Sequence, residues 1–364
     1  MMPLAIASFP YGHLSYFLSI VPILLVWYAM KRLLCFVLPA LTAGFLPQAG
    51  AQTKVLKAIP ANIQWGRYDA DAKPVITVKS GETIRVETVS GNPDTLARLD
   101  APEDDNVREL RTIYAEVKDR GPGPHILLGP IGVEGAAPGD VLQVDLVDIQ
   151  PRSAYGFNNF GPATGLLNDE FPYSRQKLIK LDLTTKMLEF SPSIHFPAKP
   201  FFGSIGVAPA AGRVNSAPPG YYAGNMDNKE IVAGTTVFIP VQRPQALLDI
   251  GDGHLAMGDG EVDVTAVESP LIGVLRLTVR KDMHLLYPRA ETPTHVITMG
   301  FHETLDEAAR RATRDMIEYL VSTRGLTRDE AYMLTSVAVD MRVTQVVDGV
   351  RGVHMMLPKA IFTK

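Results

Sequence analysis

From Pro74 to the C-terminus, the sequence consists largely of short runs of β-branched and aromatic residues, punctuated by glycine and proline. In several runs apolar and polar residues alternate with a period of two, which is typical of strands that bury one face. The runs are PVITVKSGETIRVETVSG, GDVLQVDLVDIQP, KLIKLDLTTKMLEF, TTVFIPV, GEVDVTAVES, GVLRLTVRKD and THVITMG. The pattern predicts a body that is mainly β.

Residues 190–225 interrupt this pattern. The segment FPAKPFFGSIGVAPAAGRVNSAPPG is rich in proline and glycine and shows no sustained periodicity. Such a composition favours a long ordered connection over a strand or a helix.

Helices are expected only near the C-terminus. Thr304 and Glu307 have the spacing of a capping box, and a second box joins Thr327 to Glu330. After the first box, apolar residues recur at helical spacing until Gly325, which predicts a helix end, and the second helix should reach about residue 340. The predicted fold class is therefore mainly β (α+β), a β-sandwich-like body of many short strands with a C-terminal helical hairpin packed on a sheet.

Residues 1–51 differ in composition from the rest of the chain. Starting at Met30, a short basic stretch, an apolar run and Ala49-Gly50-Ala51 have the pattern of a cleaved signal peptide. The apolar run from Leu33 to Leu46 is shorter than the roughly 20 residues that a spanning helix needs. We expect a leader at 1–51 with the true start at Met30, a domain at 52–364, and export to the periplasm or medium without a stable membrane anchor. A hairpin of two membrane spans is the alternative.

Charge and cysteine content narrow the classes of partner and chemistry. With 35 basic against 39 acidic residues the formal net charge is −4, and no basic block lies outside the leader, so nucleic acid is not an expected partner. The single cysteine, Cys35, lies within the leader. Disulfides and a cysteine nucleophile are therefore excluded from the predicted mature chain.

The segment GDGHLAMGDGE, residues 251–261, concentrates groups that could bind a ligand. It places Asp252, His254, Asp259 and Glu261 close together and separates them with four glycines. Glycine is unfavourable in helices and strands but suits a backbone with positive φ or close approach to a ligand. The pattern predicts a tight loop that aims carboxylates and an imidazole at one point.

Other segments carry similar residue types. His125 lies at the mouth of a turn, Glu134 follows an apolar run, and the loop AGNMDNKE contains Asn225 and Asp227. Histidine and carboxylate side chains together are ligand types for Zn²⁺. No local spacing matches a zinc signature, so such a site would have to be assembled across loops. G-x-S-x-G and P-loop patterns are absent from the sequence.

Three long blocks resemble the acetamidase/formamidase family. They are GPHILLGPIGVEGAAPGDVLQVDLVDI, GNMDNKEIVAGTTVFIPVQRPQALLDIGDGHLAMGDGEVDVTAVE and SVAVDMRVTQVVDGVRGVHMMLPKAIF. The resemblance runs from about residue 60 to the C-terminus. It implies a largely β fold with C-terminal helices, a homo-oligomer, and hydrolysis of short linear amides to a carboxylate and ammonia. The matching functional positions are His125, Glu134, Asn225, Asp227, Asp252, His254 and Glu261.

The sequence-based hypothesis is amide hydrolysis by a metal-activated water. The expected divalent metal is Zn²⁺, with His125, Asp227, Asp252 and His254 as ligands. Glu134 is the first choice for general base, Glu261 is the reserve, and Asn225 is expected to bind substrate. A metal-free carboxylate mechanism stays open. The non-enzymatic alternative is a periplasmic small-molecule binding protein on the same fold without turnover.

Overall fold

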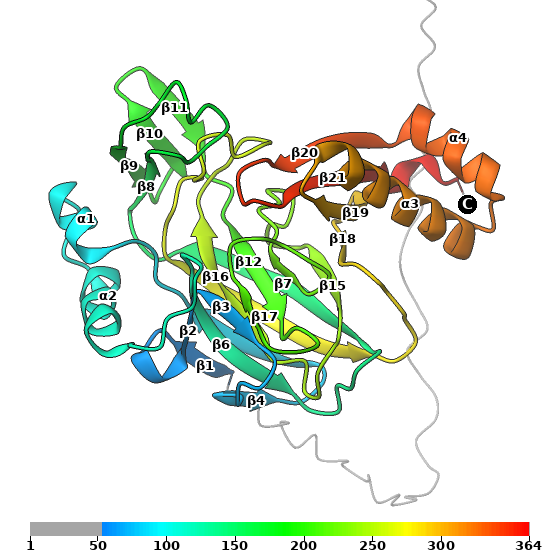
Figure 1. Ribbon diagram of the computed structural model, residues 1–364, viewed down its shortest axis with the longest axis horizontal. Helices are drawn as coiled ribbons and strands as arrows, with labels where there is room; N and C mark the ends of the chain where they lie inside the picture. The colour runs from blue at the N-terminus through cyan, green and yellow to red at the C-terminus, as the bar shows by residue number, and fades with distance from the viewer. Residues whose placement is uncertain (1–52, 364) are drawn as a thin grey trace, which may run out of the picture. The chain divides into compact units, whose positions relative to one another are not determined.

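A computed structural model describes residues 53–363 of the chain. The leader predicted at residues 1–51, with its start at Met30, lies outside the described residues. Strands dominate the described part, as Figure 1 shows. None of its helices combines the length and apolar character needed to cross a membrane.

The larger of two main sheets has nine strands in the order β1-β5-β17-β7-β15-β18-β19-β21-β20. Its strands are β1 Lys54–Lys57, β5 Glu82–Glu87, β17 Leu271–Arg280, β7 Val141–Pro151, β15 Thr236–Pro240, β18 Arg289–Glu291, β19 His295–His302, β21 Arg351–Pro358 and β20 Asp340–Gln345. Most neighbours are antiparallel, and only β1 and β5 pair in parallel within this sheet.

The second main sheet has six strands and carries most of the candidate site. Its order is β14-β12-β16-β6-β2, with β4 pairing β6 off this path. The strands are β14 Ala223–Asn225, β12 Phe201–Val207, β16 Leu248–His254, β6 Ile126–Val133, β2 Ile63–Trp65 and β4 Ile76–Val78. A smaller sheet joins β8 Tyr155–Phe160, β9 Arg175–Asp182, β10 Met187–Ser191 and β11 Ile194–Pro197, and β3 Arg67–Asp69 pairs with β13 Arg213–Asn215.

The two main sheets pack face to face around one apolar core. Phe202 of β12 lies against Gly273 of β17, where a Cβ atom would come within 2.8 Å of the phenyl ring. Leu271 of β17 meets Gly253 of β16 in the same way. These glycines allow the sheets to approach closely, and the arrangement confirms the predicted mainly β, sandwich-like body.

Two expectations about strands are wrong. The segment 190–225 contains β12, whose residues Phe201–Val207 are all buried. A strand that is buried on both faces has no period-two alternation, so its sequence does not resemble a half-buried strand. Conversely, GEVDVTAVES alternates but forms no strand beyond isolated bridges at Gly260 and Glu268.

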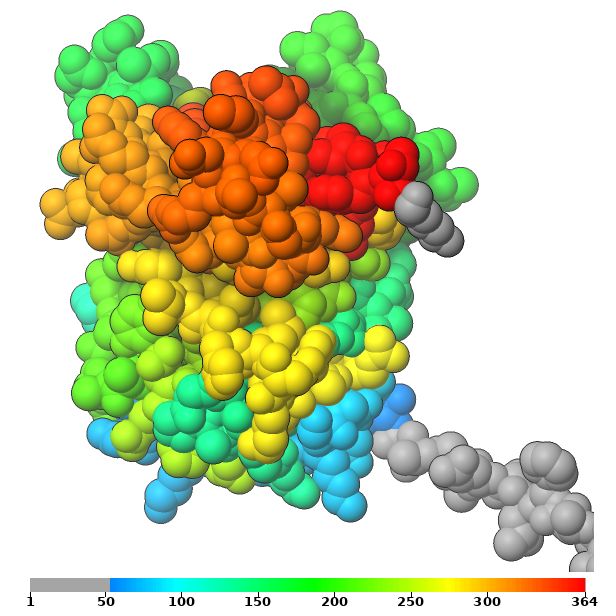
Figure 2. All heavy atoms as spheres, turned by 90° about the vertical axis from the view of Figure 1, so that its right-hand side faces the viewer, coloured from blue at the N-terminus to red at the C-terminus, as the bar shows by residue number. Residues whose placement is uncertain are grey.

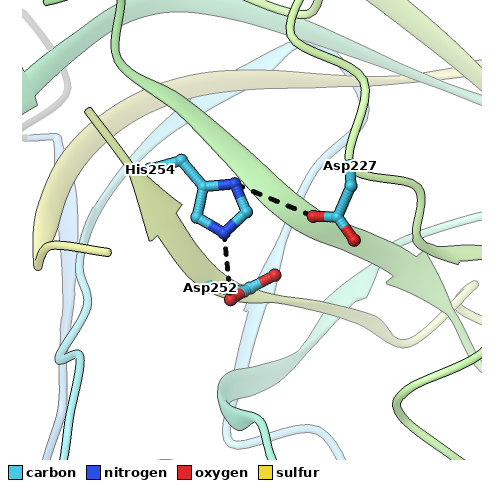
Figure 3. A group of neighbouring side chains, drawn as sticks. All are labelled: Asp227, Asp252 and His254. Carbon is cyan, nitrogen blue, oxygen red and sulfur yellow. Dashed lines mark ion pairs between the residues drawn. The ribbon is translucent and has the colours of Figure 1, made fainter. Parts of the chain in front are cut away.

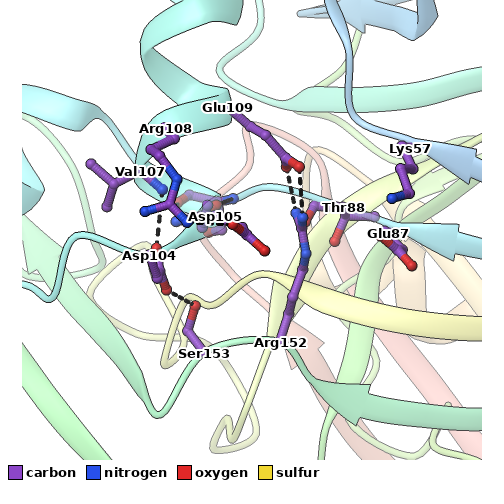
Figure 4. A network of polar contacts seen from close by, with 12 residues as sticks. Lys57, Glu87, Thr88, Asp104, Asp105, Val107, Arg108, Glu109, Arg152 and Ser153 are labelled. Atoms are coloured by element: carbon purple, nitrogen blue, oxygen red, sulfur yellow. Dashed lines mark hydrogen bonds and ion pairs between the residues drawn. The ribbon is translucent and has the colours of Figure 1, made fainter.

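Two short helices in the first half of the chain were not expected. Asn92 caps α1, Pro93–Arg98, by accepting from two backbone amides, and Asp104 caps α2, Asp105–Glu116. In Figure 4, Arg152 at the end of β7 holds α2 through two bonds to Glu109, of 2.6 and 2.7 Å. The Arg152 guanidinium also donates to the carbonyl of Thr88. Because Tyr114 of α2 lines the site cavity, these contacts help to position the cavity wall.

The predicted C-terminal helical hairpin is confirmed. It consists of α3, Leu305–Arg324, and α4, Arg328–Ala338, and the chain ends with a single turn at Lys359–Ile361. Residues Ala308, Ala312, Met316, Ile317 and Leu320 of α3 are buried against β19, β21 and α4. Figure 2 views the molecule from this side, where orange atoms of the hairpin cover the upper part of the face.

Only one of the two predicted capping boxes forms. Thr327 accepts from the Glu330 amide while the Glu330 carboxylate accepts from the Thr327 amide. Thr304 is the N-cap of α3 but makes no side-chain cap bond, because its hydroxyl lies 3.2 Å from His302 Nδ1. The Glu307 carboxylate instead pairs with Arg314 at 3.0 Å.

The end of α3 gives a prediction about stability. Gly325 has φ 66° and open space where a Cβ would lie, so Gly325→Ala introduces backbone strain without a clash. We expect the change to lower the free energy of unfolding by about 1 kcal/mol, the cost of left-handed backbone for an L-residue. Denaturant titration checks this value. Gly325→Asn should lose less, since Asn tolerates this conformation, and equal stability of the Ala variant and the native protein would contradict the assignment.

Candidate metal centre

Strand β16 supplies the central pair of the site, Asp252 and His254. The glycines next to Asp252 permit tight packing: a Cβ at Gly251 would lie 2.8 Å from the Ile126 carbonyl, and one at Gly253 would collide with the Ser269 carbonyl. Asp252 has φ 57°, a left-handed conformation that is uncommon for a residue other than glycine. Strained backbone of this kind is concentrated at functional sites, where the surrounding structure enforces it.

The loop predicted at residues 251–261 is therefore only partly correct. Its first part belongs to β16, and the loop begins after His254. Asp259 does not join the cluster, because it pairs with Arg342 at 2.7 Å and with Lys229 at 3.1 Å. These ion pairs hold the loop between His254 and Glu261 against β20.

His254 is the hub of the cluster and is 1% exposed. Its Nε2 lies 3.3 Å from Asp252 Oδ1 and 3.2 Å from Glu268 Oε1, while its Nδ1 lies 3.7 Å from Asp227 Oδ1. Figure 3 shows Asp227 and Asp252 on either side of the imidazole ring. Phe201 contacts the ring edge to face, with centroids 5.0 Å apart. The ring is thus fixed on several sides at once.

Asp227 is held by a chain of hydrogen bonds from β12. Ser204 Oγ donates to Asn225 Oδ1 at 2.7 Å, and Asn225 Nδ2 donates to Asp227 Oδ2 at 2.6 Å. Asn225 is 2% exposed, so the contacts found for it position the Asp227 carboxylate. Asn225 also lines the cavity, and the substrate-binding role expected for it stays a prediction.

His125 joins the cluster from the start of β6. Its Nε2 lies 3.8 Å from Asp252 Oδ2, and its Nδ1 lies 3.0 Å from Ser216 Oγ. The structure therefore brings together all four expected metal ligands, His125, Asp227, Asp252 and His254, and it also places Glu261 in the same cavity.

Glu134 is not brought to this cluster. It is exposed and follows the opposite end of β6 from His125. The whole length of β6 lies between the two residues, and His125 lines the cavity whereas Glu134 is not part of its wall. The general-base role expected for Glu134 therefore has no geometric support.

Two carboxylates of the cavity were missed from the sequence. Glu268 pairs with His254 as an isolated antiparallel bridge, and Asp348 lies in the turn between β20 and β21. Glu268 lies in an alternating run that was interpreted as an ordinary strand, and the Asp348-Gly349 pair is a common turn signal. Neither local pattern indicates chemistry, since only the fold brings these groups to His254.

The electrostatics reflect crowded buried charges. Burial and the neighbouring Asp252 raise the pKa of Asp227 to about 6. Burial alone would raise the pKa of Asp252 as well, but His254 and His125 hold it below its usual value. For His254, burial acts to lower the pKa, yet Glu268 and Asp252 together raise it well above the usual range. Carboxylate and imidazole groups thus stabilise each other's charged forms.

The cluster fits a divalent cation. Asp227, Asp252 and His254 each offer a ligand atom within 4.8 Å of the others. Asp227 Oδ1 and His254 Nδ1 are buried and, within the described chain, have no hydrogen-bond partner. A Cβ at Gly203 would collide with both Asp227 Oδ1 and Asp252 Oδ2. Glycine at this position therefore leaves room for the two carboxylate oxygens. Nε2 pairs with Asp252 and Glu268, whereas Nδ1 has no hydrogen-bond partner in the described chain, so Nδ1 is the nitrogen available to a metal.

The cluster forms part of the wall of a cavity of about 440 Å³. Apolar parts of the wall come from Val89, Tyr114, Ile126, Phe157 and Val264. A concave, partly apolar pocket with convergent polar groups is the usual form of a small-molecule site.

Sequence comparison matches the chain to a known family. A model of the Acetamidase/Formamidase family matches residues 54–217 and 210–364. The chain belongs to this family. The resemblance seen in the sequence is confirmed, and family membership makes the chain an amidohydrolase.

Individual relatives agree with this assignment. A formamidase from Methylophilus methylotrophus is 25% identical over 357 residues, covering 78% of this chain and 85% of that protein. An acetamidase from Mycolicibacterium smegmatis is 24% identical over 302 residues, covering 66% of this chain and 69% of that protein. The crystal structure of an acetamidase from Bacillus halodurans has 31% identity and a TM-score of 0.72, covering 85% of this chain and 98% of that one.

Proposed function

We propose that this protein hydrolyses the C–N bond of short linear amides to a carboxylate and ammonia, with a Zn²⁺ ion held by His125, Asp227, Asp252 and His254. The observation that carries the proposal is the convergence of Asp227, Asp252 and His254 in the cavity of a member of this family. Two of the candidate ligands are imidazoles and two are carboxylates, a mixture that Zn²⁺ accepts.

Amides resist hydrolysis because resonance stabilises the C–N bond and an amine is a poor leaving group. When bound, Zn²⁺ supplies positive charge that acidifies water and polarises a carbonyl. The protein must still accept a proton from water and deliver one to the leaving nitrogen.

Glu268 is the best placed carboxylate for this proton transfer. Its Oε1 accepts from the Ala266 amide at 3.0 Å and lies beside His254 Nε2. The residue is 8% exposed, and it lines the cavity. Glu268 therefore takes the role that the sequence alone had suggested for Glu134, with the Asp252 and His254 side chains held beside it.

The relatives' names suggest the substrates to test. They are a formamidase and an acetamidase, so formamide and acetamide come first and propionamide extends the acyl group. Ammonia release by the purified protein is the expected result. His254→Ala should remove the release while leaving the fold intact, which excludes contaminating amidases from the expression host.

The same experiment separates the non-enzymatic alternative. A periplasmic binding protein on this fold would bind an amide saturably, as measured by calorimetry, and would release no ammonia. Saturable binding without product would therefore overturn the enzymatic proposal. Export of the chain and assembly as a homo-oligomer stay predictions from the sequence.

A further inference from the structure

A second group of carboxylates lies beside the proposed zinc ligands. Asp227, Glu261 and Asp348 each offer an oxygen within 4.8 Å of the others. From this geometry we propose that these three residues form a second divalent-cation site, made only of oxygen ligands, with Asp227 shared between the two cations. The proposal depends on the proposed function only for the first cation.

The position of Asp348 is set by the turn that connects β20 and β21. Gln345 is fully buried, and its Oε1 accepts from the amides of Val347 at 2.9 Å and of Asp348 at 3.2 Å. Its Nε2 donates to the Val350 carbonyl at 2.6 Å. One side chain therefore closes the turn and fixes the backbone that carries Asp348.

The loop that carries Glu261 is fastened to this turn. The Gly260 amide donates to the Thr344 carbonyl at 3.0 Å, and the Val346 amide donates to the Gly260 carbonyl at 3.1 Å. Glu261 itself has φ 45°, and Asp227 has φ 46°. Two carboxylates of the group thus have left-handed backbone, which persists only where the surroundings enforce it.

Each carboxylate of the group has one buried oxygen that lacks a hydrogen-bond partner among the described residues. Asp227 is 1% exposed and Glu261 is 6% exposed. Asp227 Oδ1, Glu261 Oε2 and Asp348 Oδ2 are buried without a hydrogen-bond partner in the described part of the chain. Buried charges are costly unless they are paired or coordinate a metal. A cation bound by the three oxygens would compensate for this cost.

The charge of the whole cavity supports the same conclusion. Its described lining contains five carboxylates and two histidines, but no lysine or arginine. One divalent cation with neutral imidazole ligands leaves three of the five negative charges uncompensated. A second divalent cation reduces this to one, which is the charge that a single proton-accepting Glu268 carries.

The ligand chemistry indicates which ion the second site prefers. Oxygen-only sites suit hard cations such as Ca²⁺, Mg²⁺ and Mn²⁺, whereas the histidine-containing site suits Zn²⁺. The competing arrangement is a proton shared between Asp227 and Asp348, without any ion. The two differ in a quantity that can be measured directly, the number of metal ions per chain.

The test is metal stoichiometry of the full protein. Metal-free protein is loaded with Zn²⁺ at one equivalent, then dialysed against Ca²⁺ or Mn²⁺ and analysed by mass spectrometry of the elements. We expect two ions per chain in the native protein and one in Asp348→Asn, which keeps its zinc. His125→Ala should weaken Zn²⁺ binding and retain the second ion, and Glu134→Gln, a remote carboxylate, should keep both.

Glu261→Gln provides a second variant if Asp348→Asn fails to fold, and it should also bind one ion. One ion per native chain would overturn the second site, as would two ions retained in both carboxylate variants. Ammonia release at one ion per chain leaves the proposed function standing without the second site. Two bound ions per chain without ammonia release would support the second site and overturn the proposed hydrolytic function.

Discussion

Removal of divalent metal is expected to abolish amide hydrolysis, and Zn²⁺ is expected to restore it. Among the described residues no lysine or arginine lines the cavity, and the His254 imidazole lies among carboxylates, so a bound cation is the group proposed to stabilise a developing oxyanion. Loss of such electrostatic stabilisation should lower kcat at least about a thousandfold. The measurement is ammonia release from acetamide by chelator-treated protein, with its metal content determined, before and after addition of Zn²⁺.

Two controls make this result specific. The unfolding transition of the metal-free protein shows whether the fold survives, since a bound ion also stabilises the native state. His254→Ala should not recover activity at Zn²⁺ concentrations that restore the native chain, because it lacks a ligand. Full activity in a preparation with verified absence of metal would refute the metal hypothesis and favour a metal-free carboxylate mechanism.

Whether a strand could be predicted from the sequence depends on how many of its faces are buried. Strands with one more exposed face, such as β17, alternate between buried and less buried residues, and the period of two in the sequence predicts them directly. β12 lies between β14 and β16 and is buried throughout, so its apolar run next to several prolines was interpreted as a connection. Alternation of apolar and polar residues indicates a strand with one exposed face, and the most buried strands have no exposed face.

The helices show both what a local sequence pattern predicts and what it does not. α2 has Val107, Leu110 and Ile113 buried at helical spacing behind an Asp104 cap, a helix pattern that stands in the sequence among the strand-like runs. At α3 the box residues are present, yet His302 engages Thr304 and arginines engage Glu307. A capping pattern predicts the start of a helix more reliably than the bonds made there, because side chains nearby compete for the same groups.

For the site, the sequence could supply residue types but not distances. Asp252 and His254 were found because glycine spacing and ligand types coincide in one short segment. Glu268 and Asp348 reach the cavity only through the pairing of distant segments. Glu134 had the right chemistry in an apolar context, but the direction of β6 carries it away from the cavity.

Glu268→Gln is expected to lower kcat by about 10²- to 10⁴-fold, the usual contribution of a general base. Glutamine keeps the shape of the side chain and can still accept from the Ala266 amide, but it cannot take up a proton. Because the carboxylate is not among the proposed zinc ligands, metal content should stay unchanged. KM for acetamide should change far less than kcat, since the substitution removes proton transfer and leaves the cavity wall in place.

Glu134→Gln is the matched control for this experiment. It makes the same chemical change at an exposed carboxylate at the far end of β6, so its kcat and metal content should equal those of the native protein. A large loss in Glu134→Gln with an active Glu268→Gln would restore the sequence-based choice of base and remove Glu268 from the reaction. Loss of metal in Glu268→Gln would instead assign Glu268 to ion binding, because a proton carrier can be neutralised without releasing the ion.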